Sequence, residues 1–180
     1  MFRRFRRPGP ARQISPAELS LIKARRFLKN GKFAQAGTIF SGLAREAEYL
    51  ERRKVAAELH CRAAHCFVDG GAEQTGLSEA QAALRVFTNL GMEERGERFL
   101  NNITRKLEMH GMTAAVGSLR VEFGRSESPR AEAVAPLPNL RLPTLCPQCG
   151  GPMRSDEVEW IDRYSAECNY CGGVVQGKEN

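Results

Sequence analysis

Apolar residues recur at helical spacing from residue 16 to about residue 123. Small and aliphatic residues return there every three or four positions, which places them along one face of an α-helix. Ser15, Pro16 and Glu18 form a helix-start signature, in which the serine caps the helix and the glutamate completes a capping box. The pattern predicts a mainly α-helical chain with five main helices and a shorter sixth, at about 16–29, 33–51, 53–68, 77–90, 93–110 and 112–123.

A small residue followed three positions later by phenylalanine recurs along these helices. A small residue lets two helices approach closely, and the aromatic ring one turn away fills the gap between them. The pairs are Ala24 with Phe27, Ala64 with Phe67, and Gly96 with Phe99.

This pattern resembles the tetratricopeptide repeat over about residues 17–108, as an antiparallel array of about two and a half helix pairs. The chain lacks the family's early aromatic residue and its closing proline, and we interpret the second turn as stretched from Gly70 to Gly76. An irregular antiparallel helical bundle is the alternative.

The resemblance implies a surface for binding another protein. Tetratricopeptide proteins generally hold peptide segments of their partners on the concave face of the array. On this chain the concave face would carry Leu21, Arg25 and Leu28 of the first helix and His65 of the third. Arg25 would pair there with a carboxylate of the partner, and the alternative is an arginine solvated on the helix surface.

Four cysteines near the C-terminus have the spacing of a metal site. Cys146, Cys149, Cys168 and Cys171 follow the pattern C-x2-C-x18-C-x2-C, within the range of four-cysteine zinc sites. Two residues between cysteines allow a tight turn that directs both sulfurs at one ion, and glycines follow each pair. Four thiolates favour tetrahedral zinc and close its coordination sphere, which predicts one structural Zn²⁺. A rubredoxin-like iron site with the same ligands is the alternative.

The segment that carries these cysteines, residues 144–177, resembles a zinc ribbon. Val158 and Trp160 alternate with acidic residues between the two pairs, which predicts a short antiparallel hairpin. Trp160 or Tyr164 is expected to cover the metal turns. The segment has five acidic residues and two basic ones, a balance that opposes phosphate binding and favours a structural or protein-facing role.

The remaining residues do not indicate catalysis. Cys61 and His65 lie four positions apart on one predicted helix, but they supply only two metal ligands, so buried thiols and a partly buried histidine are expected. No nucleophile–base pair, phosphate loop or paired-carboxylate motif stands out. We therefore expect no enzymatic activity and no small-molecule substrate.

Positive charge is concentrated at the N-terminus. The net charge is +6, and residues 1–12 hold five arginines and no acidic residue, which leaves 22 basic and 21 acidic residues elsewhere. Arg3, Arg4, Arg6 and Arg7 alternate with two phenylalanines, a composition suited to an anionic membrane surface, to nucleic acid, or to a solubilising tail.

The sequence therefore divides into four parts: a basic flexible arm at 1–15, a tetratricopeptide-like helical domain at 16–124, a proline-rich linker at 125–143 and a zinc ribbon at 144–177. No secretory signal follows the charged start, so we expect a cytoplasmic protein. The leading hypothesis is a non-catalytic adaptor or scaffold that binds a protein partner. The alternatives are a nucleic-acid-associated factor that uses the arm and the ribbon, and a protein docked on a membrane surface through the arm.

Overall fold

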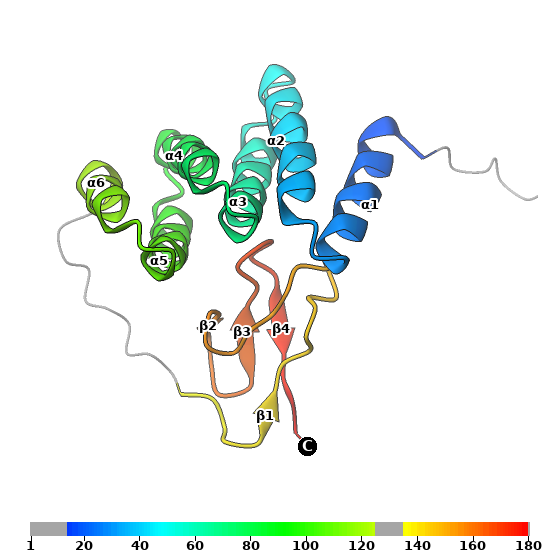
Figure 1. Cartoon of the computed structure of the whole chain (residues 1–180), viewed down its shortest axis with the longest axis vertical. Helices are drawn as coiled ribbons and strands as arrows, with labels where there is room; N and C mark the ends of the chain where they lie inside the picture. Colours follow the sequence, from blue (N-terminus) through cyan, green and yellow to red (C-terminus); the bar gives the residue numbers. More distant parts are fainter. Residues whose placement is uncertain (1–13, 125–134, 180) are drawn as a thin grey trace, which may run out of the picture.

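A computed structural model describes residues 14–124 and 135–179 of the chain. Residues 1–13 of the predicted basic arm and residues 125–134 of the predicted linker lie outside these ranges. Within them, six helices pack antiparallel in chain order, and a small β module follows (Figure 1). The helices are α1 Pro16–Lys29, α2 Phe33–Tyr49, α3 Arg53–Asp69, α4 Glu73–Asn89, α5 Glu93–Met109 and α6 Thr113–Phe123. Among the described residues, none of the helices combines the length and the apolarity needed to cross a bilayer.

The turns between the helices repeat every 20 residues. Each helix from α3 to α6 begins 20 residues after the one before it. For every helix from α2 to α6, the residue two positions before the first helical residue has a positive φ. In each turn the next amide donates a hydrogen bond to the carbonyl five residues earlier, as from Lys32 to Phe27 and from Ala72 to Phe67. The positive-φ residues are Gly31, Glu51, Gly71, Gly91 and Gly111.

Glu51 occupies a backbone conformation that glycine adopts with less strain. Its φ is 56°, and among the described residues it alone has a positive φ without being glycine. We expect Glu51→Gly to raise the free energy of unfolding by about 1 kcal/mol, because it removes the clash of a Cβ atom in the left-handed region. Urea denaturation measures the change. Arg52→Gly, at a neighbouring position with φ of −83°, is the control and should give no gain.

The fourth helix corrects the sequence-based prediction. It begins at Glu73 rather than near residue 77, so the stretched turn from Gly70 to Gly76 is wrong. Gly76 lies inside α4 at a close approach to α3, where an added Cβ would stand 2.6 Å from a side-chain carbon of Val68. The glycine therefore serves helix packing, which the sequence alone did not distinguish from a loop.

A buried polar network joins α2, α3 and α4. His60 on α3 contacts the carboxylate of Glu79 on α4 at 2.6 Å through Nδ1, and Glu48 on α2 at 3.2 Å through Nε2. The hydroxyl of Ser41 on α2 donates a hydrogen bond to the other oxygen of Glu79 at 2.6 Å. His60 and Glu79 are buried, so the network replaces apolar packing at this point in the core.

The network should make stability depend on pH. Burial lowers the pKa of His60, but the hydrogen bonds and charges of Glu79 and Glu48 together outweigh it, and the net pKa is raised above 6.5. Burial raises the pKa of Glu79, whereas the hydrogen bonds of His60 and Ser41 lower it below its ordinary value. Because the pKa of His60 is higher in the folded chain than in the unfolded one, protonated His60 stabilises the fold. This contribution is fully present below pH 6.5 and is lost as pH rises through the folded pKa.

Comparison with a neutral variant isolates this effect. The difference in unfolding free energy between the native chain and His60→Gln should be largest near pH 6, above the range in which Glu79 becomes protonated. It should then fall toward pH 9 by about 1.5–3 kcal/mol, the strength of a hydrogen bond to a charged group. Denaturation at several pH values measures it, and a constant difference would contradict the assignment.

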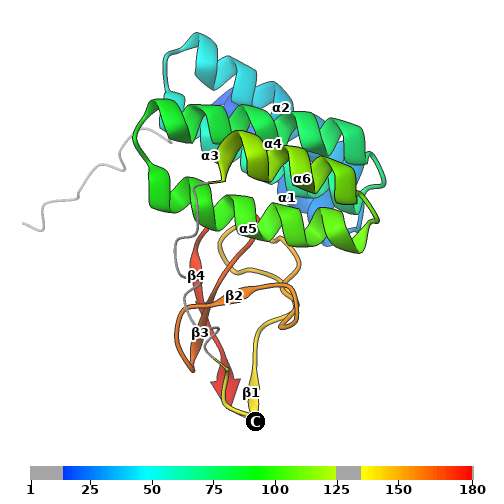
Figure 2. The ribbon, with the colours of Figure 1, turned by 90° about the vertical axis from the view of Figure 1, so that its left-hand side faces the viewer.

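The C-terminal module contains two small antiparallel sheets. Strands β2 (Glu159–Trp160), β3 (Ser165–Glu167) and β4 (Val174–Gln176) form one sheet in the order β2-β3-β4. Strand β1 (Leu140–Arg141) pairs with β5 (Lys178–Glu179). The β2–β3 pair lies between the two cysteine pairs, which confirms the predicted hairpin. Figure 2 shows the module below the array, next to α5.

Candidate metal centre

The cysteine pairs lie in two turns of the same construction. In the first, the amide of Cys146 donates a hydrogen bond to the carbonyl of Gly151, and the amide of Gly150 donates one to the carbonyl of Cys146. Cys168, Gly172 and Gly173 repeat the arrangement in the second turn. Gly150 and Gly172 have φ values of 77° and 66°. A side chain would resist this conformation, which explains the glycine after each pair.

The two turns bring four sulfur atoms together. The Sγ atoms of Cys146, Cys149, Cys168 and Cys171 all lie within 4.8 Å of one another. The Sγ distance is 3.7 Å between Cys146 and Cys171 and 3.8 Å between Cys149 and Cys168. A tetrahedral site with metal–sulfur bonds of about 2.3 Å has sulfur–sulfur edges of about 3.8 Å. These four cysteines could therefore hold a metal ion.

The electrostatics of the site suit a cation. The hydrogen bonds from Cys149 and Cys168 lower the pKa of Cys171 to about 2. The hydrogen bond to Cys149 raises the pKa of Cys168. A divalent cation would allow all four thiols to ionise, since it offsets the repulsion between the thiolates.

The module docks on the array through an aromatic residue between two of the cysteines. Tyr170 is buried, and its hydroxyl donates a hydrogen bond to Asp69 at the end of α3. Its ring centroid lies 5.5 Å from the ring of His65 on α3 and 5.2 Å from the ammonium of Lys106 on α5. Tyr170 lies between Cys168 and Cys171, so the second cysteine turn fixes the position of this side chain.

Charged residues surround the tyrosine. The ammonium of Lys106, which is 3% exposed, lies 2.7 Å from Asp69 and 3.8 Å from Glu157 of the module. Burial raises the pKa of the Asp69 carboxyl, and the charge of Lys106 opposes that shift. Arg98 on α5 pairs with Glu167 on β3 at 3.3 Å. Basic groups of the array thus face acidic groups of the module.

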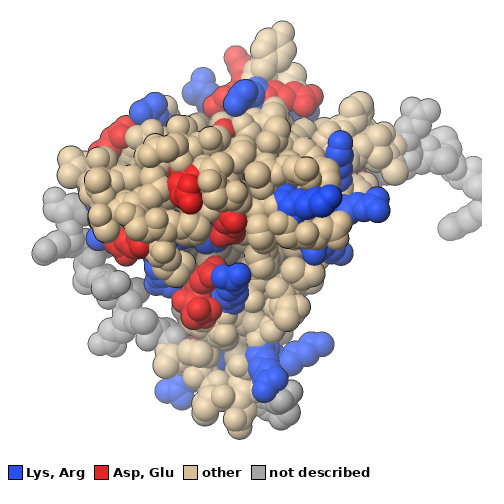
Figure 3. Space-filling view, viewed as in Figure 1, with Lys and Arg blue, Asp and Glu red and all other residues tan. Residues whose placement is uncertain are grey.

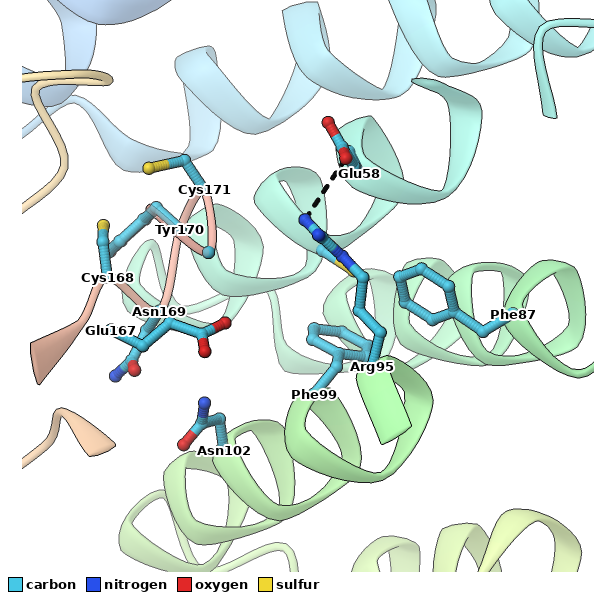
Figure 4. A pocket seen from close by; sticks show the side chains of 12 residues that line it. Glu58, Phe87, Arg95, Phe99, Asn102, Glu167, Cys168, Asn169, Tyr170 and Cys171 are labelled. Carbon is cyan, nitrogen blue, oxygen red and sulfur yellow. Dashed lines mark ion pairs between the residues drawn. The ribbon is translucent and has the colours of Figure 1, made fainter. Parts of the chain in front are cut away.

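A small cavity lies beside this contact, between α3, α5 and the second cysteine turn (Figure 4). Its volume is about 30 Å³, enough for one water molecule. Arg95 crosses its edge and pairs with Glu58 at 3.2 Å. Cys61 lines the cavity, and burial raises the pKa of its thiol beyond the range in which a thiolate forms. The cavity is therefore too small for a substrate, and burial disfavours a thiolate at Cys61.

Of the four residues predicted for partner binding, two are buried and two are at least partly exposed. His65 and Leu28 are buried, with exposures of 0% and 3%, so neither is available to a partner in this conformation. Both ring nitrogens of His65 lack a hydrogen-bond partner, and burial lowers its pKa well below 6.5. Leu21 is half-buried and Arg25 is exposed. His65 is buried because the module covers α3 at this point, where the Tyr170 ring lies 5.5 Å from the His65 ring.

An open hollow remains on α1. Its volume is about 350 Å³, and it is lined by Ile14, Glu18, Leu21, Ile22 and Arg25. Ile14 and Ile22 are 57% and 53% exposed, and the Glu18 carboxylate accepts a hydrogen bond from the backbone amide of Ser15 in the helix cap. Figure 3 shows lysine and arginine side chains gathered over α1. The exposed basic residues of this helix are Lys23, Arg25, Arg26 and Lys29.

The sequence did not identify Tyr170, Asp69 and Lys106 as parts of the site. Trp160 and Tyr164 were expected to cover the metal turns, but Trp160 is half-buried and Tyr164 is 56% exposed, whereas Tyr170 is 2% exposed. The position of Tyr170 between two cysteines was a usable signal, because a residue inside a metal-binding turn has a fixed direction.

Comparison with family models, curated proteins and solved structures finds no match for the chain.

Proposed function

We propose that this chain is a non-catalytic adaptor that binds another protein, and that its four cysteines hold one structural zinc ion. The alternation of antiparallel helices supports a tetratricopeptide-like array, and the two cysteine turns support a zinc ribbon. The observation that carries the adaptor role is the open apolar hollow on α1, which lies on a helix rimmed by basic side chains.

The donor set favours a structural zinc. Four thiolates fill a tetrahedral coordination sphere and leave no position for water or substrate. Three of the four cysteines are buried, which limits access of solvent to the ion. Iron bound by the same ligands is the competing occupant, and metal analysis of the purified protein distinguishes the two.

The hollow on α1 suits an acidic segment with apolar side chains. Ile14, Leu21 and Ile22 offer aliphatic surface, and Arg25 offers a guanidinium that can bind a carboxylate at two points. Exposed apolar residues within a charged rim are typical of protein-binding surfaces. The partner would therefore present leucine-like side chains together with aspartate or glutamate.

Affinity capture from cells with matched variants tests the adaptor role. Ile22→Glu and Arg25→Glu should each reduce recovery of a specific protein partner at least about tenfold, because they add repulsion and remove the central contacts. Lys54→Glu, an exposed charge reversal on α3, is the control and should leave recovery unchanged. Equal recovery with all variants, or recovery of nucleic acid alone, would contradict the proposal.

Binding to nucleic acid is the second candidate. It is favoured by the exposed basic residues of α1, which follow the arginine-rich sequence of residues 1–12. This function predicts binding to RNA or DNA that weakens steeply with salt and is abolished by deletion of residues 1–12. Co-sedimentation with anionic liposomes tests the membrane alternative in the same variants.

A further inference from the structure

The C-terminal module lies against α3 and α5, and we call this surface of the array its inner face. The inner face contacts the module as it would contact a ligand. Asp69 accepts a hydrogen bond from the Tyr170 hydroxyl, and His65 and Lys106 contact its ring. Phe99 on α5 completes the floor, with its ring centroid 5.6 Å from that of His65. These contacts involve side chains of α3 and α5, two helices that are separate in sequence. The array thus supplies a pocket that the tyrosine fills.

The charges around this pocket match the acidic character of the module. Lys106 faces Glu157 at 3.8 Å, and Arg98 faces Glu167 at 3.3 Å. Arg95 extends the basic rim beside the second cysteine turn. A segment with a tyrosine and two nearby carboxylates is therefore the kind of ligand that fits this face, and the module is one such segment.

The metal turn controls whether the module can present this tyrosine. Cys168 and Cys171 bracket Tyr170, so the ion fixes the backbone on both sides of it. The module is small, and few apolar residues outside the four cysteines are buried within it: Met153, Val158, Ala166, Tyr170 and Val175. A domain of this size depends on its ion for folding, so loss of the ion should release the tyrosine from the pocket.

We propose that the inner face of α3 and α5 is a second interaction surface, which binds an acidic segment bearing a tyrosine. The chain's own module covers this surface while the cysteines hold their ion, and loss of the ion uncovers it. This inference deepens the proposed adaptor function by naming a partner class and a condition for binding. It does not involve the hollow on α1.

Chemical labelling of Lys106 tests whether the surface opens. In the metal-loaded chain, acetylation of Lys106 should be slow relative to that of the exposed Lys54. Removing the ion with a chelator should raise this relative rate at least about tenfold, while circular dichroism shows that the helices remain. Protection of Lys106 that persists without the ion would overturn the proposal, and so would loss of the helices together with the ion.

Two tyrosine variants provide a matched comparison. Tyr170→Ala should expose Lys106 without any chelator, because it removes the docking side chain and keeps all four ligands. Tyr164→Ala, at an exposed position of the same module, should leave Lys106 protected. Ile22→Glu, which tests the hollow on α1, should not alter Lys106 labelling, so failure of the adaptor test and failure of this one are distinguishable.

A peptide tests the binding preference of the opened surface. The probe is a synthetic peptide of residues 156–171 with serine in place of both cysteines, added in excess to the metal-loaded Tyr170→Ala chain, whose own module has no tyrosine to place in the pocket. It should restore protection of Lys106, and the same peptide with phenylalanine in place of Tyr170 should bind about tenfold more weakly, because Asp69 then loses its hydrogen bond. Equal affinity of the two peptides, or no protection by either, would overturn the preference for tyrosine.

Discussion

Replacement of Cys168 by serine is expected to release the bound ion and to unfold the C-terminal module. A serine hydroxyl is a poor ligand for zinc, and the remaining three thiolates no longer close the coordination sphere. Structural zinc sites supply about 10–16 kcal/mol of apparent binding free energy, which the small apolar core of this module cannot replace. The sulfur of Cys168 is fully buried among the other three ligands, so the loss is not compensated by solvent.

Two measurements detect the loss of the ion and the unfolding of the module. Native mass spectrometry should show one ion in the unaltered chain and none in Cys168→Ser. The chain has one tryptophan, Trp160, whose indole donates a hydrogen bond to the carbonyl of Ser155 within the module. Its fluorescence should therefore shift toward that of a solvated indole. Cys61→Ser, which changes a thiol outside the cluster, is the control and should retain the ion. A folded module in Cys168→Ser would contradict the assignment.

Asp69→Ala is expected to lower the free energy of unfolding by about 3–5 kcal/mol, because it leaves a buried charge without its main partner. The ammonium of Lys106 would retain only Glu157, at 3.8 Å, and the hydroxyl of Tyr170 would lose its acceptor. Chemical denaturation of the metal-loaded chain measures the effect.

Two further variants show whether the unpaired charge is the cause. Asp69→Ala combined with Lys106→Met should recover part of the lost stability, since the second change removes the charge that the first leaves unpaired. Glu108→Ala breaks the exposed ion pair with Arg120 and should change stability by less than about 1 kcal/mol. An effect of Asp69→Ala no larger than that of Glu108→Ala would show that the contact with the module is weak.

Residues close in sequence allowed most of the local structure to be predicted. Helical periodicity located five of the six helices in the described ranges to within about two residues, and the cysteine spacing identified the four sulfurs that converge. The exception was α4, where Gly76 has a sequence signature that fits either a loop or a close helix contact. The partner at this contact, Val68, lies on another helix, and the contact is therefore not visible in a local pattern.

The docking of the module on the array could not be predicted in the same way. It depends on contacts across long sequence separations, such as that between Asp69 and Tyr170. Neither residue belongs to a periodic pattern or a spacing motif. The burial of His65 follows from this docking, which is why a residue assigned to an open groove by resemblance lies in the interior. Lys106 was part of an ordinary charged helix in the sequence, and only the fold shows that it is buried.

X-ray absorption at the metal edge of the purified protein tests the central claim most directly. The account predicts zinc with four sulfur neighbours at about 2.3 Å and no nitrogen or oxygen ligand. A spectrum with nitrogen or oxygen neighbours, or a folded protein with no metal bound, would contradict it.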